Sequence, residues 1–364
     1  MAFDARYYTH DSDKVALKAL KAIPGFHQLV KGFMKIWSER QYRISNMSGC
    51  LRISEAQLPQ YYRMLPPICE QLGIEVPELY LQLDVQPNAY TAGDTKPFIV
   101  MTSGLFETMP EELIPTVLAH ECGHIACHHQ LYTTIGTILK NGASTALRMF
   151  VPFGSIATLP LEMAFFYWMR CSELSADRAA VLCDGTPEKM MEVCLRFAGY
   201  DKDIDAIASK EAFLDQAREY KELVAGSKWD KTLEFLVLMS KSHPLTTVRA
   251  LECEEWAKSE QYQRILDGTY WLPEPEEEEE EAEAQMDEPV HDTAAKEKKS
   301  KTRFEMPFEL PKLNKKKDKE EQIEGMPTAQ LSVPDEIRAY KALFDDGIIT
   351  KEEFEEKKKQ LLNL

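Results

Sequence analysis

Apolar residues recur at helical spacing through most of the first two thirds of this chain. The pattern predicts amphipathic helices over residues 13–26 and 55–72. Over residues 78–83 and 97–102 the period shortens to two and strand-forming residues dominate, so two strands are expected, separated by a turn-rich piece over residues 88–94. Because helices then resume, the chain is expected to fold as a predominantly helical α+β protein with a small antiparallel sheet.

The composition changes after residue 271. Residues 272–333 contain six consecutive glutamates, 276–281, and later lysine-rich pieces. Like-charge blocks with few large apolar residues cannot bury enough surface to fold, so this stretch is expected to be a disordered linker. Solvated disorder explains the acidic block better than attraction to a basic partner does.

The C-terminal residues regain helical periodicity. A first helix begins near Pro334 and ends at Gly347, and Thr350 with Glu353 forms a capping box that opens a second. A unit this small buries little alone, so it is expected to pair with copies of itself or with a partner protein. The expected organisation is an N-terminal helical region over residues 1–49, a main domain over 50–271, the linker over 272–333 and a helical hairpin over 334–364.

Charge and cysteine content narrow the class of protein. Lys and Arg number 43 against 60 Asp and Glu, and the net charge of −17 argues against a nucleic-acid-binding surface over the whole protein, although local basic patches stay open. The eight cysteines form no CxxC pair, so neither a disulfide framework nor a cysteine zinc site is expected. The N-terminus lacks the basic start and apolar run of a secretory signal peptide. A cytoplasmic protein with reduced thiols is the simplest interpretation.

One segment bears on membrane association. Residues 149–169 are mostly apolar and about long enough to span a bilayer, but Pro152, Gly154, Pro160 and Glu162 interrupt them. An ionisable residue within a span would be costly in lipid. A buried or surface-associated helical hairpin is therefore expected in place of a span, and peripheral membrane contact through this segment stays open.

Two histidines four residues apart suggest a metal site. In His120-Glu121-Cys122-Gly123-His124 both imidazoles project from one face of a predicted helix, where they can reach one ion, and zinc is the ion expected. Glu121 lies beside His120, where it can reach a zinc-activated water instead of serving as the third ligand. This is the HExxH pattern of zinc peptidases. A buried pair of histidines without a metal is the competing interpretation.

The residues around the motif favour a helix and limit its length. Thr108 and Glu111 would form a capping box at its start, whereas Pro115 would kink the helix or mark its true beginning. His128 and His129 do not complete the longer HExxHxxGxxH pattern, which would need glycine at 127 and histidine at 130. These two histidines are expected to face solvent or to support the ligands.

A third ligand must come from elsewhere in the chain. Glu173 and Asp177 lie four residues apart in a strongly helical stretch and share one face. Glu173 could complete a His-His-Glu site, and Asp177 could accept a hydrogen bond from a ligand imidazole and so fix its tautomer. The alternative is an acidic pair on a solvated helix face, because neighbouring arginines resemble ordinary helix salt bridges. Small and apolar neighbours favour burial.

The HExxH motif followed by Glu173-Leu174-Ser175-Ala176-Asp177 resembles the M48 zinc metallopeptidases, the family of the Ste24 and HtpX proteases. Two further segments carry the likeness. Asn88-Ala89-Tyr90 is similar to the family's edge strand, and Ser242 to Arg249 is similar to its His-Pro followed by Arg. The resemblance covers about residues 50–260 and implies a zincin-like peptidase domain with its sheet beside the HExxH helix.

Roles for the metal-site residues follow from the resemblance. It implies that His120, His124 and Glu173 bind one zinc ion. Glu121 would be the general base, and Asp177 would hold a ligand imidazole in place.

The resemblance also implies roles near the substrate. His243 would stabilise the oxyanion that develops on the substrate carbonyl, and Arg249 would pair with acidic groups around the site. Asn88, Ala89 and Tyr90 would bind an extended peptide along the sheet edge. Any amphipathic hairpin would give the same strand pattern, so this last role depends on where the sheet lies.

The chain departs from the membrane members of the family. Ste24 and HtpX proteases carry several clear spans, whereas this chain offers only the interrupted segment 149–169. Prenyl-protein processing is therefore not expected, and a soluble or peripherally associated member is the better match. Residues 343–354 resemble the SHOCT module, a short C-terminal helical hairpin, which implies a role in oligomerisation or partner binding.

The function expected is that of a zinc-dependent endopeptidase that hydrolyses peptide or protein substrates with Glu121 as the general base. Two alternatives stay open. One is a non-catalytic, zinc-stabilised scaffold that oligomerises or recruits partners through its C-terminal module. The other is an exopeptidase.

Overall fold

The computed structural model describes residues 2–270, except residues 24–25, 27–29, 31–32, 34–38, 94, 141–157, 200–208 and 226–244. The expected linker, the C-terminal hairpin and His243 lie outside the described residues. Of the apolar segment 149–169, residues 149–157 also lie outside the described residues. Residues 158–169 form the start of a long helix.

Four strands form a mixed sheet in the order β1, β2, β4, β3. Strand β1 (Leu51–Ile53) is antiparallel to β2 (Glu78–Gln82), β2 is parallel to β4 (Phe98–Thr102), and β4 is antiparallel to β3 (Ala89–Ala92). The expectation of an antiparallel sheet is therefore wrong for the β2–β4 pair. Every residue of β4 is buried, and burial on both faces favours a central position over an edge.

Residues Ala89–Ala92 form a strand, β3, within the stretch 88–94 that the sequence suggested to be turn-rich. Strand β3 occupies one end of the sheet and returns to β4 through a tight connection at Gly93, whose φ is +96°. A β-carbon at Gly93 would lie 2.8 Å from the carbonyl oxygen of Lys96, so only glycine fits. The turn signal of this segment belongs to its end, and the residues before it are extended.

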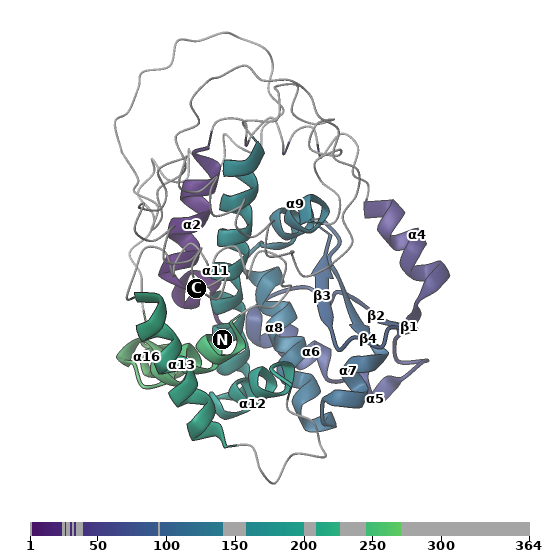
Figure 1. Ribbon diagram of the computed structural model, residues 1–364. Helices are drawn as coiled ribbons and strands as arrows, with labels where there is room; N and C mark the ends of the chain where they lie inside the picture. The colour runs from purple at the N-terminus through teal and green to yellow at the C-terminus, as the bar shows by residue number, and fades with distance from the viewer. Residues whose placement is uncertain are drawn as a thin grey trace, which may run out of the picture.

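The helices surround one face and the ends of this sheet (Figure 1). Their bounds are α1 (Ala5–Tyr8), α2 (Asp11–Lys21), α4 (Glu39–Gly49), α5 (Pro59–Tyr62), α6 (Leu65–Leu72), α7 (Ser103–Thr108), the 3-10 helix η1 (Glu111–Leu113), α8 (Ile114–Ala126), α9 (Gln130–Lys140), α11 (Thr158–Asp184), α12 (Glu188–Phe197), α13 (Lys210–Ala225), α15 (Thr246–Ala257) and α16 (Glu260–Leu266). The region expected as one helix over 55–72 is two short helices, because Leu58 adopts a left-handed conformation and prolines begin each helix.

Helix α8, which carries the HExxH motif, lies between the sheet and α11 (Figure 1). It begins at Ile114 with Pro115 in its first turn, where a proline costs no hydrogen bond. The capping box expected at Thr108 and Glu111 is wrong, because Thr108 ends α7 and the extended backbone of Met109 and Pro110 separates the two helices.

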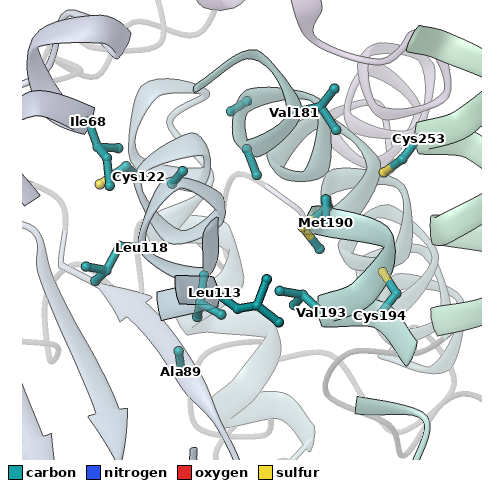
Figure 2. Packing of buried hydrophobic residues seen from close by; sticks show 14 of the residues in the cluster. Ile68, Ala89, Leu113, Leu118, Cys122, Val181, Met190, Val193, Cys194 and Cys253 are labelled. Carbon is teal, nitrogen blue, oxygen red and sulfur yellow. The ribbon is translucent and has the colours of Figure 1, made fainter. Parts of the chain in front are cut away.

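Buried apolar side chains from several helices and the sheet meet around α8. Figure 2 shows Leu118 and Cys122 of α8 and Val181 of α11 in this core, with Met190 and Val193 of α12 packed nearby. A second apolar cluster joins α2, α9 and α11 and includes Leu20 and Trp168. Helices α8 and α11 are thus held in position by packing against several other elements.

No helix in the part of the chain that the structure describes is long and apolar enough to cross a membrane.

Candidate metal centre

The close crossing of α8 and α11 sets the geometry of the centre. A β-carbon at Gly123 would lie 2.6 Å from the β-carbon of Ala179 and 3.0 Å from the α-carbon of Ala176. Glycine and alanine at these positions therefore let the two helix backbones approach. The approach brings Glu173, on the same face of α11, opposite both histidines of the motif.

His120, His124 and Glu173 lie together, as the family resemblance implied. His120 Nε2 is 3.6 Å from Glu173 Oε2, and His124 Nε2 is 3.5 Å from Glu173 Oε1. One ligand atom from each residue lies within 4.8 Å of the others, and all three side chains are buried. Tetrahedral zinc with bonds of about 2.0–2.1 Å needs ligand atoms roughly 3.4 Å apart. The donor set and its spacing therefore fit one zinc ion.

Asp177 holds the first histidine. Its Oδ1 lies 2.9 Å from His120 Nδ1, so the ring donates its Nδ1 proton to the carboxylate and directs Nε2 toward Glu173. Burial acts to lower the pKa of His120, but hydrogen bonds to Asp177 and Glu173 outweigh it and raise that pKa to about 9. A metal ion held by this ring would therefore have to displace a proton from it.

Arg249 of α15 joins the two acidic residues of α11. Its Nε donates to Asp177 Oδ2 at 2.7 Å and its Nη2 to Asp177 Oδ1 at 2.6 Å, while Nη1 lies 2.8 Å from Glu173 Oε2. Burial alone would lower the pKa of Arg249, but the two carboxylates hold it well above its ordinary value. For Asp177, burial acts to raise the pKa and Arg249 lowers it below the ordinary value. Asp177 and Arg249 therefore both stay charged in the interior.

His124 is held by another histidine. Helix α8 ends at Ala126, and His128 adopts a left-handed conformation with a φ of +55°, so the chain turns back toward the ligands. His129 is buried, and its Nδ1 lies 3.0 Å from His124 Nδ1. Burial lowers the pKa of His124 to about 4, so this ring is neutral near pH 7. His128 is exposed, as one expectation had it, whereas His129 is buried against His124.

A narrow pocket adjoins the motif. His120, Glu121 and Arg249 line it on one side, and Ala89 of β3 lines it from the sheet. Val117, Met190, Val193 and Phe197 supply apolar walls. The arrangement puts the end strand of the sheet beside the residue expected to act as the base.

The three residues of the sheet edge differ in their surroundings. The backbone of Asn88 is held by Thr102, whose hydroxyl accepts from Asn88 N at 2.9 Å. Ala89 is buried against the pocket, and Tyr90 is half-buried with its hydroxyl 3.4 Å from Gln82 Oε1. Of these residues, Ala89 alone is among those that line the pocket.

One acidic residue near the centre had no signal in the sequence. Asp13 of α2 lies 2.9 Å from His129, and the sequence pattern treated its helix as packing alone. Two acids in the first turn of a helix are ordinary there, so nothing in the local pattern marked Asp13 as buried.

Comparisons with known proteins agree with the geometry. The family description "Peptidase family M48" matches residues 63–257. The chain is 34% identical over 266 residues to the chloroplastic plastoglobule-localized metallopeptidase 48 of Arabidopsis thaliana, a match that covers 72% of this chain and 76% of the relative. It is 23% identical over 240 residues to a protease HtpX homolog of Ralstonia pickettii, covering 60% and 81% of the two chains.

The C-terminal residues match a second description. "Short C-terminal domain", the SHOCT family, matches residues 335–362. No solved structure matches the chain.

Proposed function

Because the chain belongs to peptidase family M48, we propose that it is a zinc-dependent metalloendopeptidase in which His120, His124 and Glu173 hold one zinc ion. The observation that carries this proposal is the approach of both Nε2 atoms to the Glu173 carboxylate, at 3.6 and 3.5 Å. When bound, zinc would supply the Lewis-acid charge that activates water and polarises the scissile carbonyl.

Glu121 is the proposed general base. It follows His120 on α8, is buried, and lines the same pocket as His120. Its carboxylate would take the proton of the attacking water and pass it to the leaving amine. Asp177 and Arg249 would keep His120 and Glu173 in their orientations, because both carboxylates accept from one buried guanidinium.

An extended peptide is the proposed substrate. The pocket is bordered by Ala89 of the end strand β3, which supports pairing of a peptide alongside Asn88, Ala89 and Tyr90. His243, outside the described residues, remains the proposed stabiliser of the developing oxyanion, on the strength of the family pattern.

The proposed organisation follows the sequence. Residues 1–49 would be a helical region, 50–271 the peptidase domain, 272–333 a disordered linker and 334–364 a hairpin that pairs with copies of itself or with a partner. A cytoplasmic location with peripheral membrane contact through residues 149–169 is proposed on the same basis.

A single substitution tests the mechanism. Glu121→Gln should retain zinc but lose hydrolysis of an unfolded protein by roughly 100-fold or more, because the amide cannot accept the proton. Glu112→Gln is the matched control, since Glu112 is an exposed glutamate in the turn before α8. Unchanged turnover in Glu121→Gln would reject the proposed mechanism.

A second function is kept because residues 335–362 match the SHOCT family. In this alternative the zinc site is structural and the protein is a scaffold that assembles through its C-terminal hairpin. One zinc per chain, no proteolysis and assembly that requires residues 334–364 would favour it. Cleavage of an internal bond in a peptide with both ends blocked would instead support the endopeptidase and exclude a strict exopeptidase.

A further inference from the structure

His129 links His124 to Asp13 of the N-terminal helix α2. His129 uses its two ring nitrogens in opposite directions, with Nδ1 3.0 Å from His124 Nδ1 and Nε2 2.9 Å from Asp13 Oδ2. Each of the three residues is 5% exposed or less. A buried carboxylate thus reaches a proposed zinc ligand through one intervening imidazole.

The Asp13 carboxylate is held as an acceptor. Trp168 Nε1 donates to its Oδ1 at 2.8 Å, and Ser175 Oγ donates to its Oδ2 at 2.6 Å. Ser175 in turn accepts from the backbone N–H of His10 at 3.0 Å. An ionised carboxylate only accepts hydrogen bonds, so His129 must donate to it through a proton on Nε2.

Burial acts to raise the pKa of Asp13. Contacts with His129, Ser175 and Trp168 outweigh burial and hold that pKa below its ordinary value. The carboxyl group is therefore ionised near neutral pH, in agreement with the three donors around it.

The proton on His129 Nε2 decides the tautomer of His124. A neutral imidazole with Nε2 protonated has its lone pair on Nδ1. Across the 3.0 Å contact His124 must then donate from Nδ1, which leaves the lone pair of His124 on Nε2, the nitrogen that faces Glu173. The reverse arrangement would protonate Nε2 and prevent it from binding a metal.

Packing fixes the orientation of the intervening ring. Trp168 lies edge-on to His129, with ring centroids 5.6 Å apart and planes at 85°. The backbone N–H of His129 donates to the carbonyl of His124 at 3.0 Å, which ties the turn after α8 to the ligand itself. The imidazole is therefore held from both its ring and its backbone.

We propose that Asp13 and His129 are positioning residues of the metal centre, which hold His124 in the tautomer that presents Nε2 to zinc. The inference rests on the proposed zinc site. In this proposal a buried carboxylate fixes the tautomer of each ligand histidine. Asp177 accepts directly from His120, and Asp13 acts on His124 through His129. Asp13 precedes residues 63–257, which match the family. The N-terminal helix α2 therefore contributes a residue to a centre whose proposed ligands all lie within the family-matched region.

Zinc affinity of the full chain tests the proposal without reference to proteolysis. Competition with a chromophoric chelator should show Asp13→Asn binding zinc 10–100-fold more weakly than wild type, the range typical of residues that orient a ligand. In Asp13→Asn the amide can present a donor to His129 and allow its other tautomer.

Leu20→Ala is the control for packing of α2. Leu20 lies on the same helix as Asp13 and is fully buried in the second apolar cluster, so its truncation should lower Tm by leaving a cavity. Its zinc affinity should stay within about twofold of wild type, because every hydrogen bond to Asp13 remains. Equal losses of affinity in Leu20→Ala and Asp13→Asn, or no loss in Asp13→Asn, would overturn the proposal.

Two substitutions at His129 test the proposal if Asp13→Asn does not fold. His129→Asn keeps an acceptor oxygen near the position of Nδ1, whereas His129→Leu has a similar volume and no acceptor. Asparagine should retain more of the zinc affinity than leucine, by about tenfold. Equal affinities would overturn the proposal. A chain that shows the expected affinities yet cleaves no peptide would refute the endopeptidase and leave this inference standing.

Discussion

Gly123 of α8 faces Ala179 of α11 so closely that a β-carbon on the glycine would lie 2.6 Å from that of the alanine. The HExxH pattern leaves this position open, yet the distance between the two helices depends on it. That distance determines whether Glu173 reaches both histidines. The candidate metal centre therefore depends on these small residues as well as on its proposed ligands.

Gly123→Ala should weaken both the fold and the centre. We expect a loss of about 1–3 kcal/mol in the free energy of unfolding, because the added methyl group must push α11 away. Zinc affinity should fall as well, since Glu173 moves with α11. Gly49→Ala is the control, because a β-carbon there meets no atom within 4 Å. Chemical denaturation and zinc titration give the two quantities, and an unaffected zinc affinity in Gly123→Ala would contradict this account of the crossing.

Glu173→Ala should lose zinc. Removal of a ligand should reduce affinity by more than the 10–100-fold expected for a residue that only supports one. Elemental analysis after dialysis against a weak chelator, with circular dichroism to verify folding, measures the effect. Glu192→Ala is the matched control. Glu192 lies on α12, away from the proposed ligands, and pairs with Arg196 and Lys210. A folded Glu173→Ala protein with a full complement of zinc would remove the third ligand from the site.

Arg249→Met should destabilise the zinc-free protein more than the zinc-loaded one. Loss of the guanidinium leaves the buried charges of Glu173 and Asp177 poorly compensated, at a cost of about 3–5 kcal/mol. Bound zinc would offset the charge of Glu173 and recover part of that cost. Thermal unfolding with zinc and with a chelator measures the difference.

Arg218→Met provides the comparison for a surface cation. Arg218 is about half exposed and pairs with Asp215 and Glu254, so its loss should cost about 0–1 kcal/mol whether or not zinc is present. Equal destabilisation of the two zinc states by Arg249→Met would show that Arg249 does not compensate the ligand.

Glu252 should stabilise the fold at neutral pH and lose this effect in acid. A contact with His10 at 3.8 Å and one with Lys221 at 2.7 Å lower its pKa from 4.5 to about 2, with Arg178 as a further nearby cation. Because the folded pKa is the lower one, the stabilisation is complete above pH 4.5 and disappears as pH falls toward 2.

The difference in stability between wild type and Glu252→Gln measures this effect. In zinc-free protein the difference should not decrease from pH 7 to about 5, and it should shrink steadily below that. Glu70→Gln, at an exposed position on α6, should show no such dependence. A difference that grows in acid would contradict the sign.

The sequence alone located the residues that share a helix. His120 and His124, and Glu173 and Asp177, are each four apart, and α-helical geometry puts such pairs on one face whatever surrounds them. The meeting of the two pairs could be expected only through the family resemblance, because it depends on the packing of α8 against α11.

The errors concern contacts between distant segments. Local alternation cannot distinguish a parallel from an antiparallel neighbour, so the β2–β4 pairing was missed. Asp13 and His129 are 116 positions apart, and no local pattern connects them. The contact of His129 with Asp13 also depends on the end of α8 at Ala126, because the left-handed conformation of His128 directs His129 toward the interior.

The position of Arg249 late in the chain has a consequence for biosynthesis. The ribosome releases α8 and α11 well before α15, so a nascent chain carries Glu173 and Asp177 before their shared counter-ion has emerged. Two neighbouring carboxylates resist desolvation in that state. We expect the interior around Glu173 and Asp177 to remain hydrated during translation and to close only after residue 249 has left the exit tunnel, so the candidate metal centre would form after α15 has been synthesised.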